Sequence, residues 1–275
     1  MRKSIIPALL VLLAAVPARA AIPETLTVRA VSWDVSLKSA TDKDWSARVV
    51  AEVSAAAKAG ADAIVFPEGF SDGRDVPGAL DAVKAAAGED RLVVLGYAPH
   101  RNPGEDFAYG RAYILSGGTW QIMDKLDPTP AERAAKTPLK PGVRLPLFRF
   151  RGGTAAVLAA SSLAKPEISA SLKKRGVQLV LVAAPAEDAE GAARLSRSAA
   201  ARAVELGAAV VTAPPSSAAP ALHLPAQKGF DLAPPAPKGR DFRLPWKKLL
   251  DLRVVPEGST EPRPFLESTH YQVEI

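Results

Sequence analysis

Short apolar strands alternate with helical segments along most of the chain, and this alternation limits the fold to a few classes. Residues 61–66 (ADAIVF) are continuously apolar between Gly60 and Pro67, which is typical of a strand buried on both faces. Similar patterns predict strands at 26–35 and 91–98 and helices at 44–59 and 78–87. Repeated strand–helix–strand units indicate a mainly parallel sheet with helices packed on it.

The second half of the chain repeats this pattern after a hairpin. Gly117-Gly118 separates two strand-like segments, 111–116 and 119–124, and predicts a two-residue turn between antiparallel strands. Beyond it, the sequence predicts strands at 154–160, 177–183 and 208–213 and helices at 166–175 and 192–206. No repeat or linker interrupts this series, so we expect one domain over residues 21–275.

The end of the chain has a different composition. Residues 214–245 contain eight prolines, and we expect an extended surface segment with little regular structure there. Residues 270–275 (HYQVEI) alternate in polarity and predict a last strand.

The first twenty residues have the pattern of a secretory leader. Arg2 and Lys3 precede an apolar run at 5–16, and Ala18-Arg19-Ala20 supplies a small-x-small cleavage site. The run is shorter than the roughly 20 residues that span a bilayer. We therefore expect cleavage of residues 1–20 and a secreted or periplasmic protein with no stable membrane anchor, the alternative being an uncleaved anchor.

Composition excludes several functions. The chain has no cysteine, which excludes disulfides, thiolate metal sites and any thiol nucleophile. The net charge of +6 comes without basic runs interleaved with aromatic residues, so we expect no nucleic-acid binding. The three histidines, His100, His223 and His270, lie at no metal-ligand spacing, so we expect neither a metal nor a cofactor.

Three polar motifs follow expected strands. Glu68 comes directly after a buried strand in VFPEGF, at the strand end where α/β proteins place ligands. Lys125 follows the hairpin in KLDPTPAER, which also contains Glu132. The strand at 154–160 runs into Ser161-Ser162 before a helix, a type of junction that exposes nucleophiles.

Together these motifs resemble the nitrilase, or carbon–nitrogen hydrolase, superfamily over residues 26–213. The segments RGVQLVLVAAP (175–185) and ARAVELGAAVV (201–211) add to the resemblance. It implies an α/β fold, namely a four-layer αββα sandwich in one domain, which forms a homodimer through its helical face. It also implies hydrolysis of amides or nitriles, with Glu68 as general base, Lys125 stabilising the tetrahedral intermediate and Glu132 as the second glutamate.

The family's nucleophile is missing. The family pattern places a cysteine six residues before a helix-opening proline, and counting back from Pro166 gives Ala160. A methyl group cannot form the covalent intermediate. We therefore expect a degenerate hydrolase, a pseudoenzyme that binds a small amide, nitrile or carboxylate.

Two alternatives remain open at this point. Ser161 or Ser162 could act as the nucleophile of a working amidase or nitrilase, although a hydroxyl is a weak nucleophile without a well-placed base and an extended strand would turn Ser161 away from the face of Ala160. The chain could instead have a structural or protein-interaction role with a collapsed pocket.

Each polar residue also has a purely structural interpretation. Glu68 and Lys125 could be a leftover buried ion pair, and Glu132 and Arg133 a surface acid–base couple. Arg202 and Glu205, spaced three apart, predict an ion pair within a helix.

Overall fold

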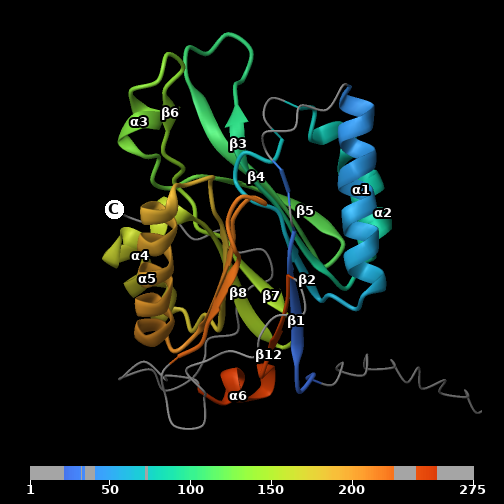
Figure 1. Cartoon of the computed structure of the whole chain (residues 1–275), viewed down its shortest axis with the longest axis vertical. Helices are drawn as coiled ribbons and strands as arrows, with labels where there is room; N and C mark the ends of the chain where they lie inside the picture. Colours follow the sequence, from blue (N-terminus) through green and yellow to red (C-terminus); the bar gives the residue numbers. More distant parts are fainter. Residues whose placement is uncertain (1–21, 32, 35–40, 72–73, 226–239, 253–275) are drawn as a thin grey trace, which may run out of the picture.

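The computed structural model describes residues 22–31, 33–34, 41–71, 74–225 and 240–252. The expected leader at 1–20 and the expected last strand at 270–275 lie outside these residues. Two sheets pack face to face, and a pair of helices covers the outer face of each (Figure 1). The molecule is therefore a four-layer α/β sandwich, as the sequence predicts.

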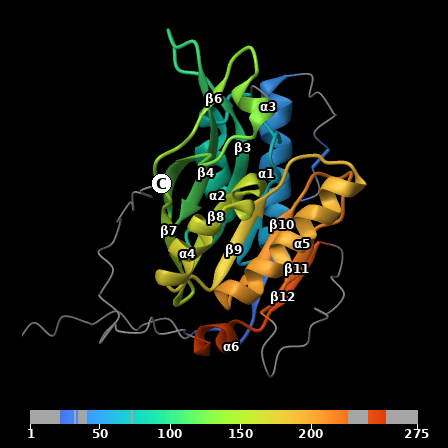
Figure 2. The ribbon, with the colours of Figure 1, turned by 90° about the vertical axis from the view of Figure 1, so that its left-hand side faces the viewer.

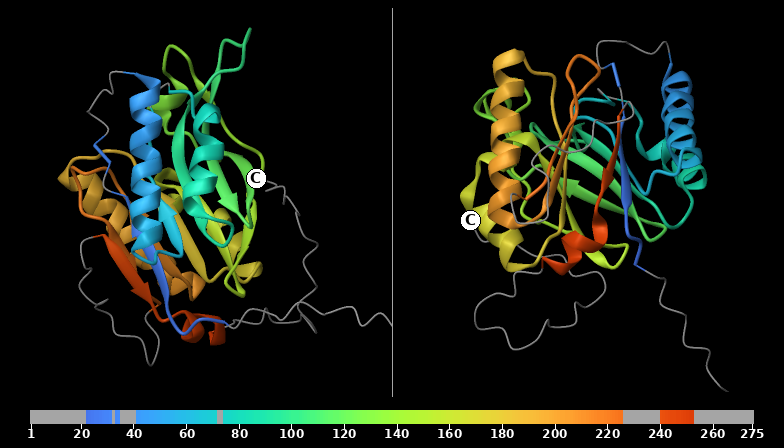
Figure 3. Two further views of the ribbon diagram at one scale, coloured as in Figure 1. Left: turned by 90° about the vertical axis from the view of Figure 1, so that its right-hand side faces the viewer. Right: turned by 60° about the horizontal axis from the view of Figure 1, so that its bottom comes forward.

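The first sheet carries the N-terminal half of the chain. Its strand order is β12 (Asp241–Leu244), β1 (Leu26–Ala30), β2 (Ala63–Val65), β3 (Leu92–His100), β4 (Ala108–Ser116) and β5 (Thr119–Asp124), and β6 (Leu139–Lys140) pairs with β4. Strands β1, β2 and β3 are parallel, whereas β4 and β5 form the expected antiparallel hairpin. Helix α1 (Asp42–Lys58) and helix α2 (Leu80–Ala87), which follows the 3₁₀ helix η1 (Pro77–Ala79), cover the outer face (Figure 3).

The second sheet carries the C-terminal half. Its order is β11 (Ala221–His223), β10 (Ala209–Ala213), β9 (Leu179–Ala183), β8 (Gly153–Ala159) and β7 (Leu147–Phe150). Helices α4 (Pro166–Lys174) and α5 (Ala189–Leu206) lie on its outer face (Figure 2). Three short helices complete the described structure: α3 (Pro130–Arg133), the 3₁₀ helix η2 (Ala160–Ala164) and α6 (Trp246–Asp251).

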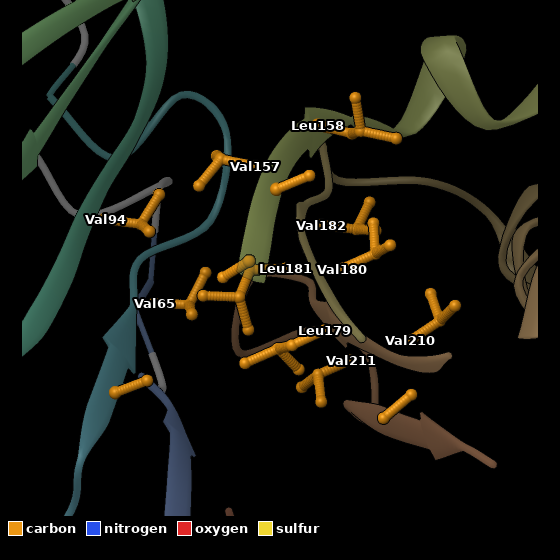
Figure 4. Packing of buried hydrophobic residues seen from close by; sticks show 14 of the residues in the cluster. Val65, Val94, Val157, Leu158, Leu179, Val180, Leu181, Val182, Val210 and Val211 are labelled. Atoms are coloured by element: carbon orange, nitrogen blue, oxygen red, sulfur yellow. The ribbon is translucent and has the colours of Figure 1, made fainter. Parts of the chain in front are cut away.

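The core lies between the two sheets. Val65 and Val94 of the first sheet point towards Val157 and Leu181 of the second (Figure 4). Neighbouring residues on each strand point to the helices instead and are equally buried. Burial on both faces explains why these strands are continuously apolar in sequence.

Local signals explain the element ends. The Thr41 side chain accepts a hydrogen bond from Asp44 N and caps α1, and Asp188 caps α5 in the same way. Gly117 and Gly118 have φ of 55° and 70°, which the hairpin turn requires and which glycine adopts without steric cost.

Three expectations were wrong in detail. Residues 214–245 include two edge strands, β11 and β12, because the prolines flank these strands without interrupting them. The first strand ends at Ala30, well before residue 35. Ala160 begins a 3₁₀ helix, whereas the sequence pattern placed it in the preceding strand.

Within the part of the chain that the structure describes, no helix has both the length and the apolar character to cross a membrane.

Candidate active site

The loop that carries Glu68 is bonded to both sheets. It follows β2, and the backbone N–H of Glu68 donates to the carbonyl of Ala184, just beyond β9, at 3.0 Å. The N–H of Gly69 donates to the carbonyl of Tyr97 in β3 at 2.7 Å. Glu68 therefore lies where the carboxyl ends of the inner strands of both sheets meet, which is the usual ligand site of α/β folds.

Gly96 allows this loop to approach β3. A Cβ atom added at Gly96 would lie 2.1 Å from the carbonyl oxygen of Pro67. Any larger residue would have to displace the backbone next to Glu68.

Lys125 joins the two glutamates. It follows β5, its side chain is 2% exposed, and its Nζ lies 2.6 Å from Glu68 Oε1 and 2.9 Å from Glu132 Oε1. Its backbone N–H donates to the carbonyl of Gly110 at 2.7 Å, and its carbonyl accepts from Gly142 N at 2.8 Å. We call Glu68, Lys125 and Glu132 the acid–lysine cluster.

A capping box fixes Glu132. The Thr129 hydroxyl accepts from Glu132 N at 3.3 Å, and Glu132 Oε2 accepts from Thr129 N at 2.6 Å, with Pro130 opening α3. Glu132 thus pairs with Lys125, while Arg133 contacts Asp127 at 3.4 Å. The surface-couple interpretation is wrong for Glu132.

The pKa values of the three side chains in the cluster are shifted in different directions and for different reasons. Burial raises the pKa of Glu68 to about 7, although Lys125 opposes this shift. Burial disfavours the charge of Lys125, but the two carboxylates outweigh it and the pKa of Lys125 is raised. For Glu132, hydrogen bonds from Lys125 and Thr129 outweigh burial, and its pKa is lowered. A carboxyl group that titrates near neutral pH is suited to general acid–base chemistry.

Ala160 lies at the same end of the second sheet. The preceding Ala159 pairs with Ala183, whose next residue, Ala184, accepts the hydrogen bond from Glu68 N. The Ser161 hydroxyl donates to the carbonyl of Asp127 at 2.5 Å, which ties η2 to the loop after Lys125. The two serines do not alternate as in an extended strand, because this segment is helical. Ser162 is 1% exposed, and its hydroxyl has no hydrogen-bond partner.

A cavity of about 320 Å³ opens beside the cluster. Its lining residues are Glu68, Gly69, Tyr97, Ala98, Pro99, Gly110, Glu132, Leu139, Pro185 and Ala186. Lys125, Ala160 and Ser161 do not belong to this lining. The cavity is therefore acidic at one wall and mainly apolar elsewhere.

The sequence did not single out most of this wall. Tyr97 packs in the core while also lining the cavity, with its hydroxyl 3.3 Å from Met123 Sδ. Pro185 follows a buried strand as Glu68 does, a position that could have marked it. Among the described residues, no three His, Asp or Glu side chains gather as a metal site would require.

The fold has many counterparts among solved structures. Saccharomyces cerevisiae Nit3, a member of branch 10 of the nitrilase superfamily, aligns with a TM-score of 0.67 and 16% identity over 87% of this chain and 97% of its own. A cysteine-to-alanine mutant of the amidase from Nesterenkonia sp. AN1 in complex with butyramide aligns with a TM-score of 0.57 and 19% identity, over 83% of this chain and 94% of its own.

A larger protein contains a similar fold as one part. Glutamine-dependent NAD+ synthetase from Acinetobacter baumannii aligns with a TM-score of 0.54 and 15% identity over 70% of this chain, which spans 39% of the length of that protein. No curated protein sequence matches the chain. At these identities, the solved structures establish the fold alone.

Sequence assigns the family. The family model for carbon-nitrogen hydrolases matches residues 27–218, a range that contains Glu68, Lys125, Glu132 and Ala160. Because this match covers well over half of the chain, the chain belongs to the carbon-nitrogen hydrolase family.

Proposed function

We propose that the chain binds a small organic molecule in the cavity beside Glu68 and no longer hydrolyses it. The observation that carries this proposal is an open cavity on an assembled acid–lysine cluster in a chain that has no cysteine. Ala160 stands at the position that the family resemblance gives to the nucleophile. Removing the nucleophile from a set of residues that act together costs on the order of 10⁶ in turnover.

Binding does not require the lost thiol. The Nesterenkonia amidase whose cysteine is replaced by alanine was obtained in complex with butyramide. By analogy, a pocket of this fold without its thiol is able to hold a ligand. The resemblance suggests an amide, a nitrile or a carboxylate.

The alternative functions have less support. The Ser161 hydroxyl is engaged with the carbonyl of Asp127, and Ser162 is buried, so neither is arranged as a nucleophile beside a base. A purely structural role does not explain why the cavity beside Glu68 is open.

Two assays test the proposal. We expect no turnover of a broad panel of nitriles and amides, and saturable binding of at least one small amide, nitrile, carboxylate or amine in a chemical-shift titration. Turnover that Ser161→Ala abolishes would establish the serine hydrolase instead. A complete absence of binding would favour the structural role.

Export and assembly complete the proposal. The leader-like residues 1–20 support a secreted or periplasmic location, and the family resemblance supports a homodimer. Helix α5 exposes Val204, whose exposed fraction is 52%, on the outer helical layer where such a dimer would form.

A further inference from the structure

Among the residues that the structure describes, those lining the cavity present hydrogen-bond acceptors and no free side-chain donor. Its two charged side chains are Glu68 and Glu132. The neighbouring ammonium of Lys125 already serves both carboxylates, and this side chain is 2% exposed. The Tyr97 hydroxyl is buried against Met123 Sδ.

Several backbone N–H groups beside the cavity already donate to carbonyl groups of the protein. Glu68 N and Gly69 N donate to the carbonyls of Ala184 and Tyr97. Pro99 and Pro185 have no N–H group to offer. An anionic ligand would therefore meet two carboxylates and few donors.

One acceptor in this wall lacks a partner. Glu68 Oε2 is buried and accepts no hydrogen bond, which is costly for a carboxylate oxygen. Glu68 lines the cavity, and the terminal torsion of a glutamate side chain has a broad range, so a ligand in the cavity can bind this oxygen. A ligand that brings N–H donors and positive charge would satisfy it.

We propose that the cavity selects a small primary ammonium ion, with its nitrogen at Glu68 and Glu132 and its alkyl group on the apolar wall formed by Ala98, Pro99 and Leu139. This inference rests on the proposed ligand-binding function and narrows it to a chemical class. An ammonium donates three hydrogen bonds, whereas a nitrile donates none and a carboxylate repels the wall.

The test compares four ligands with the same carbon chain. Calorimetric titration of the full chain at pH 8 with butylamine, butyramide, butyronitrile and butyrate is expected to give at least tenfold tighter binding for butylamine than for the others. Glu68→Gln should weaken butylamine at least tenfold. The control Glu24→Gln should leave binding unchanged, because Glu24 precedes β1 and so lies at the opposite end of the parallel strands.

A pH series provides a measurement on the unsubstituted chain. Lys125, Glu132 and Tyr97 face Glu68 from the segment after β5, from α3 and from β3. With a pKa of about 7, the ionised fraction of Glu68 rises about tenfold from pH 6 to pH 8, while the amine stays protonated. Butylamine affinity should rise by the same factor.

The outcomes separate the two proposals. Binding of butyrate, butyronitrile or butyramide as tightly as butylamine would overturn the ammonium inference and leave the ligand-binding function standing. Butylamine affinity that is unchanged by pH or by Glu68→Gln would also overturn it. A failure of all four ligands would overturn both.

Discussion

The acid–lysine cluster contains one positive and two negative side chains. One lysine serves two carboxylates, and only Glu68 Oε2 is left without a partner. A buried arrangement of this kind seldom gives a net gain in stability, because desolvation offsets most of the attraction. We therefore interpret its presence next to a cavity as functional.

Removing the shared cation should be costly. Lys125→Met keeps much of the side-chain volume but leaves two carboxylates buried together, so we expect a loss of about 3–5 kcal/mol in the free energy of unfolding. Urea denaturation measures it. The control Lys247→Met removes an exposed partner of Glu24 and should have a far smaller effect. If both substitutions lower the free energy of unfolding equally, the buried ion pairs of the cluster contribute no more to stability than an exposed ion pair.

The Glu68 titration should appear in the pH dependence of stability. Since its folded pKa is about 7 and its ordinary value about 4.3, the folded state binds more protons between these values. The Glu68 contribution to stability therefore falls as pH rises from 5 to 8. The lowered pKa of Glu132 acts below this window.

Glu68→Gln isolates this contribution. Between pH 5 and pH 8, the free energy of unfolding of the variant should rise by on the order of 3 kcal/mol relative to that of the unsubstituted chain, because glutamine does not titrate. Urea unfolding at both pH values measures the difference. If the difference in unfolding free energy between the two proteins does not change with pH, the pKa of Glu68 is not raised.

Elements were predictable where local signals agreed with burial. Gly60 and Pro67 bracket β2, and Gly117-Gly118 marks the hairpin; both predictions were confirmed. The Arg202–Glu205 pair within α5 was also confirmed. Strand β12 could not be foreseen, because its pairing partner β1 lies more than 200 residues away in sequence. Strand β11 lies close to its partner β10, but the prolines around it hid its pairing.

Contacts between elements were harder to foresee than the elements. Gly96 lies inside β3, and nothing in its sequence context shows that the carbonyl of Pro67 comes so near. Motif matching brought out Glu68, Lys125 and Glu132, whereas the cavity wall comes from strand ends that only the fold brings together.

Adding one methyl group at Gly96 tests how closely β3 must approach the loop that carries Glu68. Gly96→Ala should displace the loop and cost about 1–3 kcal/mol in unfolding free energy, with reduced ligand affinity. Gly110→Ala offers a milder comparison, because its Cβ would meet Lys125 Cβ at 3.1 Å. Thermal unfolding of both variants gives the ranking, and a fully stable Gly96→Ala would show that the loop position is not tightly set.

In the homodimer that we propose, two copies meet through the layer formed by α4 and α5, which is one of the two outer helical layers. On the proposed dimer model, sedimentation should show two chains at micromolar concentration, and Val204→Asp on α5 should give a monomer. Ile122→Asp on β5 removes another exposed apolar side chain and should leave the dimer intact. A protein that is monomeric before any substitution would contradict this model.

The central claim is that Ala160 occupies the nucleophile position of a hydrolase site whose other charged groups persist. Because the chain has no cysteine, labelling of Ala160→Cys with iodoacetamide reports on a single thiol. Ser161→Cys is the matched control, since residues 160 and 161 are adjacent and similarly half-buried.

We expect the thiol at position 160 to react faster than the thiol at position 161, because Glu68 is placed to accept its proton and Lys125 to stabilise the thiolate. Adding Lys125→Met should slow the labelling at position 160. Equal labelling rates and equal pH profiles at positions 160 and 161 would contradict the assignment of Ala160 to a nitrilase-type site.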